Sequence, residues 1–295
     1  MIIVQIFFTL LLVGPMFLGW RNRVKFKGTT PQKDPNYVTA MVNSGVLYAL
    51  AFNIIFFLQE LFLVLGKKAL GLQAFLYHNN HIWTGEHPES LLMQGTGALG
   101  IFLVGLICLF IFRLLLGSRS LWKPFFLWLA FNGLIQSIPQ VMAAYFAPNT
   151  DVGEALVGYL NLSQPVLIGL ALVSMMATAL ISIWFSRPLL GLVPDAADLN
   201  NPRVKVRYIG FVAAGASIIG SILVVPFKIP PMDQAINPFI VLVFSVPWMW
   251  SAAAMSKPAG RAPNRINEKI QWAPIALLAF LLIFFRLVLA PGVEF

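Results

Sequence analysis

The sequence predicts an all-α fold: a polytopic transmembrane helical bundle of about eight helices. Of its 295 residues, 59% are hydrophobic and only 11% are charged, which is more apolar surface than a soluble domain can bury. The apolar residues also gather in runs long enough for the roughly 20 residues that a bilayer crossing requires. Because the loops between these runs are short, we expect residues 1–295 to form a single integral membrane domain.

Each apolar run predicts one helix. The first covers residues 1–20, and its basic residues follow it rather than precede it, the reverse of a secretory signal; we therefore expect a retained helix. The other helices are predicted over residues 40–65, 92–116, 122–147, 155–185, 208–227, 237–255 and 271–290. Pro139 and Pro165 are expected to kink or break the fourth and fifth helices, because proline removes a helical hydrogen bond.

The distribution of charge predicts the topology. Most of the 20 basic residues lie within residues 21–33, 113–123, 187–207 and 257–269, and short cytoplasmic loops accumulate Lys and Arg. Both termini should therefore face the outside. The same rule explains the net charge of +9 without nucleic acid as a partner. The expected partners are the lipid bilayer and other membrane protein subunits, and the expected location is a bacterial inner (cytoplasmic) membrane.

Glu60 is the acidic residue that the sequence places inside a predicted span. Intramembrane carboxyl groups usually face the bundle interior, a partner or water. Two interpretations remain open: a metal ligand, general base or proton carrier, and a carboxyl group that holds helices together through hydrogen bonds.

The segment YHNNHIWTGEHP follows Glu60 and contains His78 and His81. If this segment were helical, the two imidazoles would share a face, and with a carboxylate such as Glu60 or Glu86 they could bind zinc. The alternative is an interfacial loop, with Trp83 at the level of the lipid headgroups.

Amide side chains supply the other polar groups inside the predicted helices. They are Asn53 and Gln59 in the second helix, and Asn132 and Gln136 in the fourth. Such amides commonly bridge membrane helices, and they could equally line the polar path of a transporter. Asp151 follows in the turn PNTDVGEA, which by itself is typical of a solvated outer loop.

Three motifs together resemble the site-2 protease family of intramembrane zinc metalloproteases. QELFL (59–63) stands where that family has HExxH, GTGALG (95–100) stands at its small-residue motif, and the stretch from Asn132 through Pro139 to Asp151 and Gly153 is similar to its Asn-Pro and Asp-Gly motifs. The resemblance covers residues 50–160, and residues 165–295 are additional helices. It implies that Glu60 is the general base and Asp151 a zinc ligand.

The sequence departs from that family at the two metal-binding histidines, which are replaced by Gln59 and Leu63. Zinc hydrolases need about three protein ligands and a water, and leucine cannot coordinate a metal. We therefore expect a pseudoprotease that acts as a scaffold or as a subunit of a membrane complex.

Two alternatives remain. One is a divergent metallohydrolase with Glu60 as its base, in which His78 and His81, with Asp151, would hold zinc. The other is a transporter of small molecules or ions.

Overall fold

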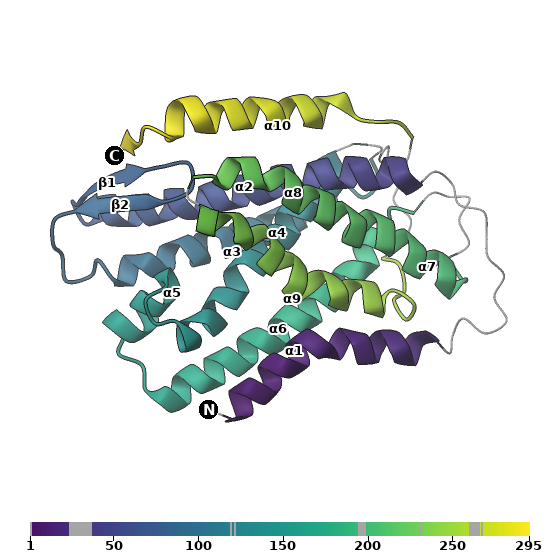
Figure 1. Cartoon of the computed structure of the whole chain (residues 1–295), viewed down its shortest axis with the longest axis horizontal. Coiled ribbons are helices and arrows are strands. Elements are labelled where there is room, and N and C mark those ends of the chain that lie inside the picture. Colours follow the sequence, from purple (N-terminus) through teal and green to yellow (C-terminus); the bar gives the residue numbers. More distant parts are fainter. Residues whose placement is uncertain are drawn as a thin grey trace.

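The computed structural model describes residues 2–23, 37–118, 120, 122–193, 199–230, 232–259, 266 and 268–295. Within these residues, eight helices are long and apolar enough to cross a membrane, which confirms the predicted helical bundle (Figure 1). In chain order the elements are α1 (Ile2–Asn22), α2 (Tyr37–Ala69), β1 (Gln73–Leu76), β2 (His81–Thr84), η2 (Leu92–Gln94), α3 (Gly95–Leu114), α4 (Trp122–Phe146), α5 (Asp151–Gly153), η3 (Glu154–Tyr159), α6 (Gln164–Leu190), α7 (Pro202–Ile209), η4 (Gly210–Gly215), α8 (Ala216–Lys228), η5 (Met232–Ile236), α9 (Asn237–Ala252), α10 (Trp272–Phe284), η6 (Phe285–Leu289) and β3 (Val293–Glu294).

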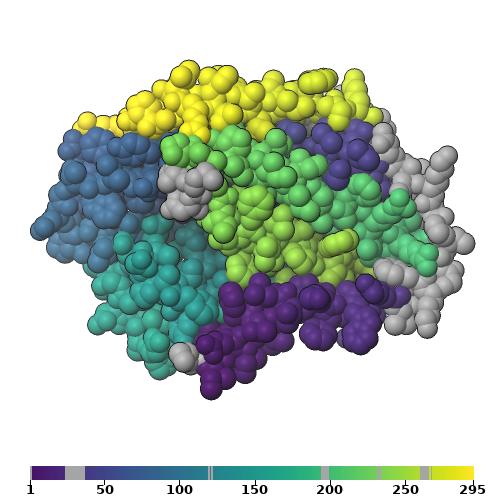
Figure 2. All heavy atoms as spheres, in the orientation of Figure 1, coloured from purple at the N-terminus to yellow at the C-terminus, as the bar shows by residue number. Residues whose placement is uncertain are grey.

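The core is built around α2 and α4, whose most apolar stretches are 61% and 67% buried. The corresponding stretches of α1 and α10 are only 17% and 22% buried, and these two helices lie along opposite edges of the face shown in Figure 2. Large apolar side chains such as Phe17 and Phe280 point away from the protein there. Helices with this composition and exposure belong in a lipid bilayer, so the chain is an integral, multi-pass membrane protein.

The start of α1 and the C-terminus both lie toward the end of the bundle that carries the β-strands and α5, the C-terminus beside the strands and the start of α1 beside α6 (Figure 1). We call this the outer end and the opposite end, which carries α7, the inner end. An even number of spans brings the two termini to the same side, as the charge pattern requires; which side faces the cytoplasm stays a prediction. Parts of the loops on which that prediction rests, residues 24–36, 194–198 and 260–265, lie outside the described residues.

The two prolines that were expected to kink or break helices have different positions in the structure. The fifth span begins at Gln164 rather than at 155, and Pro165 occupies its first turn, where the missing N–H would have no partner in any case. The helix predicted over residues 155–185 is thus interrupted directly before Pro165, as expected, since the preceding π-helical segment η3 ends at Tyr159. Asn161, at φ 47°, turns the chain toward α6. Helix α4 continues through Pro139, so it is not broken there, and the alternative of a kink stays a prediction.

The histidine segment is not helical. β1 and β2 form an antiparallel hairpin with Leu76 opposite His81, and Tyr77 N–H donates to the Asn80 carbonyl at 2.8 Å to close the turn. Phe, Ile, Trp and Thr favour strands, and the Asn-Asn pair favours the turn between them. β3 adds to the other edge of β1, giving the strand order β2-β1-β3. Two histidines three apart consequently share no helical face: His78 lies in the turn and His81 begins β2.

Candidate functional site

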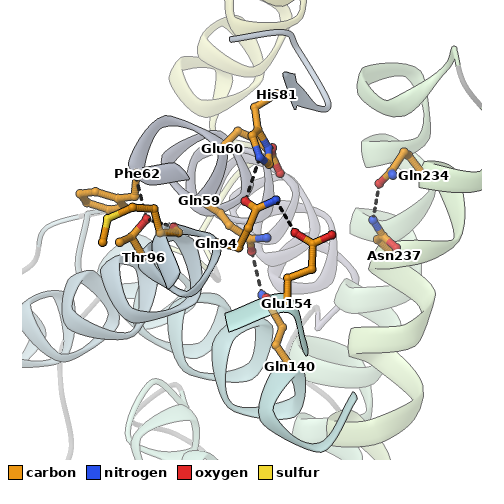
Figure 3. A network of polar contacts seen from close by, with 11 residues as sticks. Gln59, Glu60, Phe62, His81, Gln94, Thr96, Gln140, Glu154, Gln234 and Asn237 are labelled. Atoms are coloured by element: carbon orange, nitrogen blue, oxygen red, sulfur yellow. Dashed lines mark hydrogen bonds and ion pairs between the residues drawn. The ribbon is translucent and has the colours of Figure 1, made fainter. Parts of the chain in front are cut away.

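A buried pair of ionisable side chains lies at the outer end, where α2 meets the hairpin. Oε2 of Glu60 is 2.8 Å from Nδ1 of His81, and the two residues are only 5% and 7% exposed. In Figure 3 the imidazole points down onto the carboxylate from β2. The membrane acid predicted from the sequence thus has a charged partner inside the protein, which is how such residues are generally accommodated.

Gln94 connects this pair to a second carboxylate. Its Nε2 donates to Oε2 of Glu154 at 3.1 Å, and its Oε1 lies 3.1 Å from Nε2 of His81 (Figure 3). An ionised carboxylate only accepts hydrogen bonds, so Glu154 fixes which way the Gln94 amide faces. Both ring nitrogens of His81 then face oxygen atoms, an arrangement that favours the doubly protonated imidazole when Glu60 is ionised.

The electrostatics agree with this assignment. Burial by itself lowers the pKa of His81, but the hydrogen bond and the negative charge of Glu60 outweigh it, and the pKa is raised above its ordinary value. His81 is therefore an imidazolium that links two carboxylates, Glu60 directly and Glu154 through Gln94.

Close packing of α3 on α2 brings Gln94 to this position. Gly97 faces α2 so closely that a Cβ there would lie 2.8 Å from Cγ of Leu63 and 3.0 Å from Cγ of Gln59. The small-residue run that begins α3 thus lets the two helices approach, and the residue just before the run reaches His81.

Two contacts hold the hairpin in place. The Asn79 side chain donates to the carbonyls of Lys228 at 3.0 Å and Pro230 at 2.6 Å, which ties the turn to the end of α8. The outer end of α2 provides the second contact, which involves Lys67 and Trp83. The position of His81 therefore depends on elements far apart in the sequence.

The second contact is a stack of three side chains. Lys67 Nζ lies 3.8 Å above the centroid of the Trp83 ring and donates to the Ser90 carbonyl. Trp83 in turn stacks on His81, with ring centroids 5.8 Å apart and an interplanar angle of 14°. Lys67 is fully buried, so this cation is part of the packing around the pair.

Glu60 and His81 also line a cavity of about 500 Å³ between α2, the hairpin turn, α4, α5 and α9. Amide side chains line it as well, contributed by Gln59, Asn79, Asn80, Gln136, Gln140, Gln234 and Asn237. The aromatic rings of Phe52, Phe56 and Phe244 form apolar walls. The cavity therefore combines charged, hydrogen-bonding and aromatic groups, the usual composition of a small-molecule site.

Asp151 lines the same cavity but is not part of the hydrogen-bonded pair. Burial raises the pKa of its carboxyl group to about 6, and the negative charges of Glu60 and Glu154 raise it too, against the opposing effects of His81 and Lys67. Among the described residues its side chain makes no ion pair or hydrogen bond. It is the acidic group of the cavity that lacks a partner within that part of the chain.

Of the amides predicted from the sequence, Gln59 and Gln136 line the cavity, whereas Asn53 and Asn132 do not. Gln140 Nε2 donates to Gln59 Oε1 at 2.9 Å (Figure 3), and Gln136 Nε2 donates to Asn132 Oδ1 at 3.2 Å. Asn132 itself donates to the Trp128 carbonyl at 3.0 Å. These side chains form a line along α4 that leads from the cavity into the bundle. Asn53 lies apart from this line and donates to a carbonyl of its own helix, that of Ala49, at 2.9 Å.

His78 lies apart from the pair. It is buried in the hairpin turn, and burial followed by the positive charge of Arg286 lowers its pKa, with a smaller contribution from Lys228. Across the described residues no group of three or more His, Cys, Asp or Glu side chains is close enough to hold a metal ion. The structure therefore gives no support to zinc held by His78, His81 and Asp151, which stays a prediction.

Comparison of the chain with protein-family models, with curated proteins and with solved structures finds no match. The resemblance to site-2 proteases consequently stays an expectation from the sequence. What can be argued about function rests on the cavity and its side chains.

Proposed function

We propose that the protein binds a small ligand carrying a protonated amine in the outer cavity, and that it binds this ligand without hydrolysing it. The observation that carries the proposal is the carboxyl group of Asp151, which lines the cavity with no partner among the described residues. A partly buried carboxylate is costly until a cation pairs with it. An ammonium group supplies that charge and up to three hydrogen-bond donors.

The rest of the lining suits the same ligand. The faces of Phe52 and Phe244 attract a cation through their π-electrons, and the surrounding amides both donate and accept hydrogen bonds. A volume of about 500 Å³ falls in the range of small-molecule sites. The ligand class is thus a small amine with further polar groups.

The contact that Glu60 makes with His81 favours binding of a ligand over its hydrolysis. Its Oε2 is engaged by His81, and Gln59 and Leu63 stand where the protease family has its metal-binding histidines. The carboxylate that the resemblance names as a general base therefore serves as the counter-ion of an imidazolium. Its role in the cavity is to set the local charge.

Transport is the physiological class that we propose for this binding. The line of amides from Gln140 to Asn132 extends from the cavity into the bundle, and polar groups at that depth are typical of a substrate path. A scaffold role in a membrane complex stays a prediction, because the exposed apolar faces of α1 and α10 fit lipid as well as protein.

The test uses purified full-length protein in a neutral detergent. Ethanolamine, putrescine and choline are titrated at pH 7.5, with ethylene glycol as the uncharged counterpart of ethanolamine, and the midpoint of thermal unfolding is measured. At least one amine should raise the midpoint, and ethylene glycol should not. If no amine raises it, the proposal is wrong.

Asp151→Asn and Glu86→Gln provide matched variants, since each removes one acid at the outer end but only Asp151 lines the cavity. Asp151→Asn should abolish the amine-induced shift, whereas Glu86→Gln should retain it. Because the pKa of Asp151 is about 6, amine affinity of the wild type should fall as the pH drops below 6. An Asp151→Asn variant that binds amines as tightly as the wild type would overturn the assignment.

A further inference from the structure

A second hollow lies at the inner end, on the opposite side of the bundle from the amine cavity. It is a groove of about 540 Å³ between α7, η4, α9 and the first turns of α2. Two arginines, Arg203 and Arg207, line it together with the apolar side chains of Met41, Phe211 and Trp250. This inner groove shares no lining residue with the outer cavity.

The sequence of α7 explains why both arginines reach the groove. Arg203 and Arg207 are four residues apart and therefore on the same face of the helix, and both are exposed, whereas Val204 and Tyr208, the residue after each arginine, are buried. The side chain of Asn201 caps the helix by accepting from Arg203 N–H at 3.0 Å. The two guanidinium groups are thus presented side by side on a short, capped helix.

The apolar wall is formed by the close approach of α9 to the end of α7. Trp250 Nε1 donates to the Val206 carbonyl at 3.0 Å, and a Cβ on Gly210 would lie 3.1 Å from that nitrogen. The absence of a side chain at Gly210 therefore allows the indole to lie across η4. The Trp250 residue remains 47% exposed, so the wall is continuous with the lipid-facing surface of α9.

We propose that this inner groove binds one anionic phospholipid, with its phosphate on Arg203 and Arg207 and an acyl chain along Phe211 and Trp250. Guanidinium groups bind phosphate oxygens through paired hydrogen bonds, and each has five donors, enough to hold a phosphate beside other partners. The charge rule puts this end on the cytoplasmic side, where basic pockets between membrane helices bind anionic headgroups.

The apolar wall decides between a lipid and a free phosphate ion. A soluble phosphate would use the arginines alone and leave Phe211 and Trp250 uncovered, whereas a phospholipid satisfies both halves of the groove. A tryptophan at this depth is also typical of the membrane–water interface. The occupant that fits both the charge and the wall is therefore a phospholipid.

The experiment is native mass spectrometry of the full chain in neutral detergent, after incubation with dioleoyl phosphatidylglycerol or dioleoyl phosphatidylcholine, which have the same acyl chains. The anionic lipid should be retained as one adduct at roughly tenfold higher occupancy, because both lipids carry a phosphate but only phosphatidylcholine adds a cationic choline that opposes the two arginines. Equal retention of the two lipids would overturn the proposal.

Substitutions of arginine test whether the bound lipid lies in the inner groove. Arg203→Gln/Arg207→Gln should lose it, and Arg207→Gln alone should weaken it, while Arg113→Gln, which removes an exposed charge from the same end of the bundle, should retain it. If Arg113→Gln loses as much lipid as Arg207→Gln, the binding reflects surface charge alone and no groove site exists.

A titration with inorganic phosphate distinguishes the two sources of the anion. We expect phosphatidylglycerol to raise the midpoint of thermal unfolding and millimolar inorganic phosphate to leave it unchanged. If phosphate alone raises the midpoint equally, the groove binds a free ion and the lipid proposal is wrong. Because these arginines are exposed, we expect the variants to fold, and the amine-induced shift of the outer cavity gives an independent check.

Discussion

The two ends of the bundle treat charged side chains in opposite ways. At the outer end, Glu60, His81 and Lys67 are nearly or fully buried, and each has a partner in the protein. At the inner end, Arg203 and Arg207 are exposed beside a groove. A buried charge must find its partner when the chain folds, so these three outer side chains fix the shape of the protein. An exposed charge can also bind a group from its surroundings beside the partners that it has in the protein, and we propose that the two inner arginines do so.

Glu60→Ala should have the largest effect on stability. The substitution leaves the His81 imidazolium buried without its counter-ion, and removing one partner of a buried pair costs about 3–5 kcal/mol. We expect this loss in the free energy of unfolding, measured by denaturant titration in mixed micelles. Glu86→Ala, at an exposed position of the same end, is the control and should change stability by less than about 0.5 kcal/mol. Equal effects would contradict the view that the outer charges are structural.

Lys67→Met should cost about 1.5–3 kcal/mol, the range for hydrogen bonds that involve a charged group. The substitution removes the bond to the Ser90 carbonyl and the cation above Trp83. Lys68→Met offers a closely matched control, because the neighbouring lysine is exposed. Denaturant titration in the same mixed micelles measures the free energy of unfolding of both variants. If Lys68→Met lowers the free energy of unfolding by as much, the burial of Lys67 does not explain the effect of Lys67→Met.

Asp151→Asn should stabilise the protein, in a manner that depends on pH. The pKa of Asp151 is raised from 3.8 to about 6 in the folded state, so folding favours the protonated form and ionisation destabilises the fold as the pH rises through this window. The variant should therefore unfold at a higher temperature than the wild type at pH 7.5, and the difference should disappear near pH 4. A difference that is constant across this range would show that Asp151 is not the titrating group.

Arg207→Gln should have the smallest effect on stability, within about 0.5 kcal/mol, because exposed charges contribute little to folding. The same denaturant titration measures it, and wild-type protein stripped of lipid by repeated detergent exchange is the reference. A cost comparable to that of Glu60→Ala would erase the contrast between the two ends of the bundle.

The transmembrane helices could be predicted because their signal is local. Runs of apolar residues long enough to cross a bilayer are visible without knowledge of any contact, and Glu60 stood out as a carboxyl group within such a run. The helix boundaries were less accurate where proline was involved. Pro165 was expected to interrupt the helix predicted over residues 155–185, and the chain does leave the helix before it. The boundary itself was missed, because α6 begins anew at Gln164 with Pro165 in its first turn, where proline is tolerated.

The partners of Glu60 could be predicted only in part. His81 was identified as a polar neighbour, but the hairpin that carries it has strands of four residues, too short for periodicity to separate strand from loop. Gln94 and Glu154 were missed, because they reach the site through the packing of α3 on α2 and through the π-helical segment after α5. The position of Gln94 directly before the small-residue run of α3 was the available signal.

The short strand β3 has a practical consequence for work on this protein. Val293 and Glu294 pair with β1, and Phe295 N–H donates to the Ala74 carbonyl at 2.8 Å, so these residues support the strand that lies against β2 and hence against His81. An affinity tag fused directly to Phe295, or loss of the last three residues, would disturb one edge of the sheet beside the cavity. The start of α1 is exposed at Ile2 and pairs with none of the three strands, which makes it the better point for attaching a tag or a fluorescent label.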